Sequence, residues 1–170
     1  MSEAPAPAPE FAELVAATNY SFLRGASHPH EMVAQAIALG MAGVGIADRN
    51  SVAGVVKAWA FLKEQQAGKP EMTKDFRLIV GARLAFADGT PDIVAYPASR
   101  HGWGRLTRLL SVGNLRAQKG DCILRFEDLL DHCDDLLLIA MEGKEDMLHI
   151  LKRRRPRSVW LAATMPHSGA

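Results

Sequence analysis

The sequence predicts an α/β fold built on a mainly parallel sheet with one inserted β-hairpin. Short apolar runs of strand length alternate with longer segments whose apolar residues recur at helical spacing. Runs such as LLLIA (136–140) are apolar throughout, which is typical of strands buried on both faces. Two neighbouring runs are instead separated by the turn signal Asp88-Gly89, which indicates a hairpin.

The composition fits one domain with a sizeable core. The 170 residues carry a net charge of +1, and 48% of them are hydrophobic. This balance excludes a disordered chain and a basic wrapper of nucleic acid, and no apolar run is long enough to span a membrane. The Ala/Pro-rich residues 1–10 lack the features of a signal peptide and predict a flexible tail. We therefore expect one cytoplasmic domain over residues 11–170.

The first half of this domain contains two strand–helix units. Residues 11–17 predict a buried strand, and a helix follows with Ser27 as its N-cap and Gly40 at its end. Residues 43–48 (GVGIAD) predict a second buried, parallel strand.

A second helix should begin at Asn50 or Ser51 and end near Ala67 and Gly68. Its expected core face consists of Val52, Val55, Val56, Trp59 and Leu62. The polar residues 68–77 then predict a loop.

The predicted hairpin pairs residues 78–86 with residues 92–96. A helix over 99–112 should follow, and its expected apolar face is Trp103, Leu106, Leu109 and Leu110. Residues 113–121 predict a loop.

The last third predicts alternating short strands and helices. Strands are expected at 122–124, 136–140 and 158–164, with helices at 126–132 and 145–154. No helix is predicted after the last strand, and a closed (β/α)8 barrel usually needs roughly 250 residues. The chain is therefore short for a closed barrel.

Spacing alone identifies no complete active site. His28-Pro29-His30 could in principle hold a metal, but it lies at a predicted helix start, where residues two apart do not share a face. The phosphate-binding glycine motifs and the nucleophile-elbow motif are absent from the sequence. The basic run 152–155 together with Arg157 could contact a phosphate backbone or could be a solvated helix end.

Several collinear segments carry a family resemblance. These are TNYSFLRGASHPHEMVAQAIALGMAGVGIADRNSVAGVVKAW, IVGARLAF, YPASRHGWGRLTRLLSVGNLRAQKGDC, LLLIA and VWLAAT. In this order they resemble the PHP domain that begins bacterial C-family DNA polymerase α subunits, above all the error-prone, translesion branch. The resemblance covers roughly residues 11–165. It implies a PHP-type distorted (β/α) barrel that is incomplete here, comprising the N-terminal part and truncated before barrel closure.

The resemblance also implies a degenerate metal site. Metal-competent members resemble H-x-H-S-x-Y-S-L-L-D-G-A, T-D-H and G-x-E, and the matching positions here are Val15, Ala17, Arg24, Asp48, Arg49 and Arg83. Valine and alanine offer no lone pair, and a guanidinium has no acceptor. At about 4 Å and an effective dielectric of 20, a unit charge pair repels by about 4 kcal/mol, and a divalent ion by about twice that. We therefore expect no bound metal and no catalytic residue in this segment.

For these positions two arrangements remain open. Arg24, Arg49 and Arg83 could fill the former metal pocket with Asp48 as a charged cluster, or the arginines could extend into solvent.

For function, the resemblance implies a parent polymerase that copies damaged DNA in an SOS-type response, with magnesium bound outside this segment. Its implied partners are the remainder of the polymerase chain, DNA, a sliding clamp and translesion helper proteins, with no membrane. This segment would then be a structural part of the polymerase. The alternatives are an active metal-dependent PHP phosphoesterase or 3′–5′ exonuclease, and a stand-alone α/β binding module.

Overall fold

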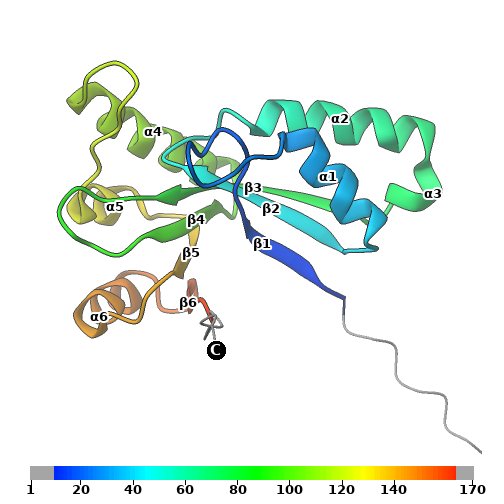
Figure 1. Cartoon of the computed structure of the whole chain (residues 1–170). Coiled ribbons are helices and arrows are strands. Elements are labelled where there is room, and N and C mark those ends of the chain that lie inside the picture. The colour runs from blue at the N-terminus through cyan, green and yellow to red at the C-terminus, as the bar shows by residue number, and fades with distance from the viewer. Residues whose placement is uncertain (1–9, 164–170) are drawn as a thin grey trace, which may run out of the picture.

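The computed structural model describes residues 10–163, which form an α/β fold: one curled β-sheet with helices around it (Figure 1). The predicted flexible tail, apart from Glu10, lies outside the described residues, as does Thr164 at the end of the last predicted strand. Within the described range, no helix is long and apolar enough to cross a membrane.

The sheet follows the order of the chain. Its strands are β1 (Ala12–Ala16), β2 (Gly43–Arg49), β3 (Arg77–Leu84), β4 (Ile93–Pro97), β5 (Leu136–Ala140) and β6 (Val159–Leu161). The pairs β1–β2, β2–β3 and β5–β6 are parallel, whereas β4 runs antiparallel to both of its neighbours. The predicted mainly parallel sheet with an inserted hairpin is therefore confirmed.

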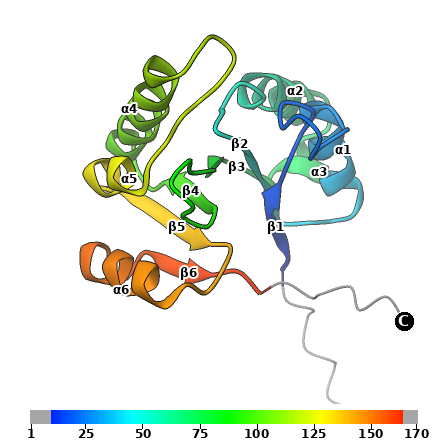
Figure 2. The ribbon, with the colours of Figure 1, turned by 60° about the vertical axis from the view of Figure 1, so that its left-hand side comes forward.

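The sheet curls around its inner face, and the helices lie on the outside of the curl (Figure 2). In the described part of the chain, β1 and β6 are the two edges and do not pair with each other. This half-barrel agrees with the expected incomplete PHP-type barrel.

The helices are α1 (Pro29–Ala38), α2 (Val55–Gly68), α3 (Pro70–Thr73), α4 (Arg100–Arg116), α5 (Phe126–His132) and α6 (Glu145–Arg154). Two of them correct the sequence prediction. Short α3 lies inside the predicted loop 68–77, because Pro70 suits a first helical position. Helix α4 runs four residues past its predicted end, and there Gly113 packs against Leu124, which leaves no room for a Cβ atom.

Two predicted helix starts were also wrong. The N-cap of α1 is His28 rather than Ser27, and its backbone N–H donates to the Glu31 carboxylate at 2.7 Å. Helix α2 begins after Gly54 instead of at Asn50 or Ser51. Asn50 lies in the left-handed region (φ 46°), and its side chain both donates to and accepts from the backbone of Ala85. Asn50 therefore connects the end of β2 to β3 and is not available as a cap.

Two predicted core faces were too wide. On α2 the buried residues are Ala58 and Leu62, whereas Val56 is 71% and Trp59 54% exposed. Helix α2 packs against α1 and β3 along one narrow stripe, which leaves Val56 and Trp59 in solvent and Val55 and Phe61 half-buried at its border. On α4, Leu106, Leu109 and Leu110 are buried as expected, but Trp103 remains partly exposed.

Two predicted strands are shorter than expected. Residues 122–124 contribute a single bridge, between Leu124 and Phe86, and β6 has three residues. Trp160 and Leu161 in β6 are about half exposed, because no described element packs on the far side of that edge strand.

The inner face of the sheet is organised around Tyr96 of β4. Its ring crosses β3 and β2 at Gly81 and Gly45, where a Cβ atom would overlap it. Its hydroxyl donates to the carbonyl of Leu14 in β1 at 2.5 Å. Burial, and then the Glu13 carboxylate, raises the pKa of the Tyr96 hydroxyl, which keeps it a donor. One side chain thus connects β4 to β1 across the curl.

Candidate functional site

A pocket lies at the edge of the sheet where β1, β2 and β3 reach their carboxyl ends. Seven residues line this pocket, which we call the arginine pocket: Val15, Ala17, Ser21, Arg24, Ala47, Arg49 and Arg83. The hollow has a volume of about 410 Å³. Carboxyl ends of parallel strands are the usual place for ligands in α/β sheets. The structure therefore brings together five of the six site positions that the sequence singled out.

Strand geometry explains which residues face the pocket. Side chains alternate between the two faces of a strand, so Ala47 and Arg49 of β2 point to the same side. Arg49 and Arg83 are direct neighbours in the parallel register of β2 and β3. Two guanidiniums therefore start from adjacent strands at the same level of the sheet.

The sixth position, Asp48, lies on the other face of β2 and does not line the pocket. It is 1% exposed and accepts three hydrogen bonds: from the Thr18 amide at 2.7 Å, the Thr18 hydroxyl at 2.8 Å and the Ser21 hydroxyl at 2.7 Å. The Ser21 hydroxyl in turn accepts the Arg49 amide at 2.9 Å. Asp48 therefore holds the loop after β1 against β2, and its charge is satisfied by neutral donors rather than by the arginines.

Asp92 is the carboxylate that faces the arginines. Its Oδ2 atom lies 2.7 Å from Nε of Arg83 and 3.7 Å from Nη1 of Arg24. The side chains of Asp92 and Arg83 are 20% and 26% exposed, whereas Arg24 is 45% exposed. The pair with Arg83 is therefore the firmer contact, and Arg24 extends partly into solvent.

Sequence reasoning missed Asp92 as a site residue. The sequence offered one weak indication: Asp92 comes just before the second strand of the hairpin, and that position lies opposite the end of β3, the strand that bears Arg83. Thr18 and Ser21 stand in the family motif, but only the fold shows that they bind Asp48.

The lining of this pocket offers a divalent cation no carboxylate or imidazole ligand. Val15 and Ala17 have no donor atoms, and three of the seven lining residues carry fixed positive charge. The oxygen atoms of Asp48 are already bonded to Thr18 and Ser21. Among residues 10–163, no group of three or more His, Cys, Asp or Glu side chains could hold a metal. His28 and His30 stack on each other with ring centroids 5.5 Å apart, at the start of α1.

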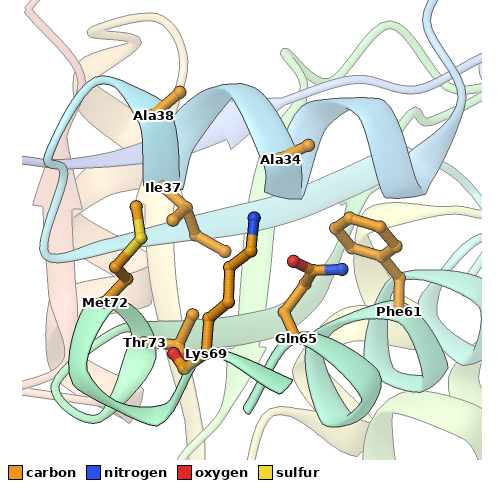
Figure 3. A pocket seen from close by; sticks show the side chains of 8 residues that line it. All are labelled: Ala34, Ile37, Ala38, Phe61, Gln65, Lys69, Met72 and Thr73. Atoms are coloured by element: carbon orange, nitrogen blue, oxygen red, sulfur yellow. The ribbon is translucent and has the colours of Figure 1, made fainter. Parts of the chain in front are cut away.

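A second hollow lies between α1, α2 and α3 (Figure 3). Ile37, Phe61 and Met72 give it an apolar wall, and Lys69 and Gln65 extend into its rim. Lys69 is the one charged residue in its lining, whereas three arginines line the arginine pocket. The arginine pocket is therefore the stronger candidate.

Comparison with known proteins places the whole described domain in one family. A family model of the PHP domain matches residues 13–162. Error-prone DNA polymerase 1 of Rhizobium meliloti (strain 1021) is 50% identical over 167 residues, which cover 94% of this chain and 14% of that protein. The error-prone DNA polymerase of Rhodopseudomonas palustris (strain BisA53) is 57% identical over 123 residues, or 72% of this chain and 10% of that protein. The chain thus spans about a seventh or less of the length of these relatives.

Among solved structures, a proposed metal-dependent phosphoesterase from Bifidobacterium adolescentis aligns with 87% of this chain and 51% of its own. Its TM-score is 0.46 at 20% sequence identity.

Proposed function

The chain belongs to the PHP domain family, and we propose that it is the N-terminal PHP domain of an error-prone DNA polymerase that copies damaged DNA. The observation that carries the proposal is the 50% identity to error-prone DNA polymerases over 94% of the chain. Since the match covers 14% of those proteins, nucleotide transfer and its magnesium ions belong to segments beyond this one.

Within the polymerase, the role of this domain is structural and independent of metal. The arginine pocket supports this role, because its lining offers a divalent ion no carboxylate or imidazole. The net charge of +1 also suits a domain that packs against the rest of a polymerase better than one that grips DNA. Contact with DNA, a sliding clamp and translesion helper proteins would then come through the remainder of the chain.

Metal analysis of the purified chain tests the loss of the metal site. After exposure to zinc and manganese followed by gel filtration, we expect well under one equivalent of either metal. The matched control carries the family's pattern at the five pocket positions: Val15→His, Ala17→His, Arg24→Asp, Arg49→His and Arg83→Glu. If this variant retains metal and the unchanged chain does not, the substitutions account for the loss.

The same preparation separates this role from that of a phosphoesterase or 3′–5′ exonuclease. Stoichiometric metal in the unchanged chain, or manganese-dependent release of nucleotides from a DNA 3′ end, would overturn the structural role.

The polymerase assignment has a separate test. The DNA that follows the codon for Ala170 should read on into a polymerase palm, and the joined protein should extend a primer past an abasic site. Unrelated downstream DNA, together with a soluble chain that unfolds cooperatively by itself, would support a stand-alone module instead.

A further inference from the structure

We propose that the arginine pocket at the carboxyl ends of β1–β3 binds a phosphate group. The proposal rests on this pocket alone and does not depend on the polymerase assignment. Of the seven residues that line the hollow, three are arginines and none is acidic. The residues at these positions therefore give a pocket lined by positive charge, which favours an anion over a cation.

The arginines retain donors that the described residues do not occupy. Arg83 uses its Nε atom for Asp92, and within residues 10–163 its two terminal nitrogens have no hydrogen-bond partner. In the same range the guanidinium of Arg49 makes no hydrogen bond and no ion pair. Arg24 shares the Asp92 oxygen only at 3.7 Å, beyond hydrogen-bond distance. Each of the three guanidinium groups can therefore turn toward a ligand in the hollow.

The local charge favours an anion. The pocket lining carries three guanidiniums and no carboxylate. Of the carboxylates beside it, Asp92 pairs with Arg83, and Glu13 accepts the backbone N–H of Val15. Asp48 lies on the other face of β2, where it is bonded to Thr18 and Ser21. The guanidiniums outnumber the two neighbouring carboxylates, which suits an anion such as phosphate. Guanidinium forks also bind the oxygens of phosphate in pairs, which a point charge cannot do.

The small residues supply the space for this ligand. Val15, Ala17 and Ala47 leave a hollow of about 410 Å³ in front of the guanidiniums. That volume admits a phosphate group together with part of the molecule that carries it. The source can therefore be free phosphate or the phosphorylated end of a nucleic acid strand.

Isothermal titration calorimetry on the 170-residue chain tests the proposal, with inorganic phosphate added at constant ionic strength. We expect one saturable site, which Arg49→Gln weakens by about tenfold, the usual scale for one charge-assisted hydrogen bond. Arg83→Gln should weaken it similarly, and Asp92→Asn should strengthen it by removing the competing carboxylate. Arg108→Gln, at an exposed position of α4, is the matched control and should change nothing.

A second titration distinguishes the sources, with a short oligonucleotide that either carries or lacks a 5′-phosphate. Tighter binding of the phosphorylated strand than of both the unphosphorylated strand and inorganic phosphate would identify a strand end as the ligand, and binding of the phosphorylated strand no tighter than that of inorganic phosphate would identify free phosphate. The proposal fails if phosphate does not saturate a site, or if Arg108→Gln weakens binding as much as Arg49→Gln. Circular dichroism checks the fold of each variant. Arg49→Gln remains decisive even if Arg83→Gln unfolds the chain, because within residues 10–163 the Arg49 guanidinium makes no hydrogen bond and no ion pair that the fold would lose.

Discussion

Replacing Gly45 with alanine should disrupt the connection that Tyr96 makes across the curled sheet. A Cβ atom at this position would overlap the Tyr96 hydroxyl and lie 3.0 Å from Cζ of the same ring and 3.1 Å from Cα of Leu14. Overpacking of this kind costs about 1–3 kcal/mol, and loss of the hydroxyl's hydrogen bond to Leu14 costs roughly 1 kcal/mol more. We therefore expect Gly45→Ala to lower the free energy of unfolding by about 2–4 kcal/mol.

A double-mutant cycle isolates the contact responsible. Tyr96→Phe removes the hydroxyl that the new methyl group would meet, so Gly45→Ala should cost less in that background. The expected coupling is about 1–2 kcal/mol, which is within the range for residues in contact. The assay is urea unfolding followed by the fluorescence of the three tryptophans, with the slope compared between variants.

Gly104→Ala is the matched control. Gly104 lies inside α4, and a Cβ atom there would meet nothing within 4 Å, so alanine should stabilise the helix by roughly 0.5–1 kcal/mol. The reasoning is refuted if Gly45→Ala is as stable as the unchanged chain, or if the coupling with Tyr96→Phe is below about 0.3 kcal/mol.

Three further predictions concern other buried or paired groups. Asp48→Asn should destabilise the chain by about 2–4 kcal/mol, because an amide cannot accept from all three donors around it, whereas Asp121→Asn at an exposed position should be neutral. Urea midpoints should show the difference, and equal midpoints would contradict it. The Arg116 guanidinium lowers the pKa of Asp128, so this stabilisation is present above the ordinary pKa of 3.8 and is lost as the pH falls below it. Asp128→Asn should therefore flatten the fall in the urea midpoint in that acid range, and parallel profiles would count against the pairing. Burial raises the pKa of the Cys133 thiol, so a disulfide reagent should label it much faster in urea than in buffer, and equal rates would be inconsistent with its 3% exposure.

Much of the fold is local enough to predict from the sequence. The ends of each strand from β1 to β5 fall within two residues of those predicted from an apolar run, and the Asp88-Gly89 turn predicts the antiparallel pair β3–β4. The errors lie at helix starts and exposed faces. Asn50 has the side chain of a cap, yet it pairs with the backbone of Ala85, which is 35 residues away. Periodicity also cannot show that Val56 and Trp59 face solvent, because that depends on where α1 packs.

The candidate site was predictable only in its residue types. Positions aligned with a family motif identify Val15, Ala17, Arg24, Arg49 and Arg83, and these five residues do line one hollow. The motif groups Asp48 with them, although the alternation of side chains along β2 turns it to the other face. No motif points to Asp92, whose contact with Arg83 depends on the turn and register of the hairpin.

The sequence by itself determined the order of the elements and the inserted hairpin, because these features depend on residue type and on spacing within a few positions. Its resemblance to the PHP family singled out five of the residues that line the arginine pocket. Only the tertiary structure decided that Asp48 holds a loop, that Asp92 faces the arginines and that Tyr96 connects β4 to β1. The physical reason is that such contacts join residues far apart in the chain or across a turn, and they form only once strand register and sheet curl set which side chains meet.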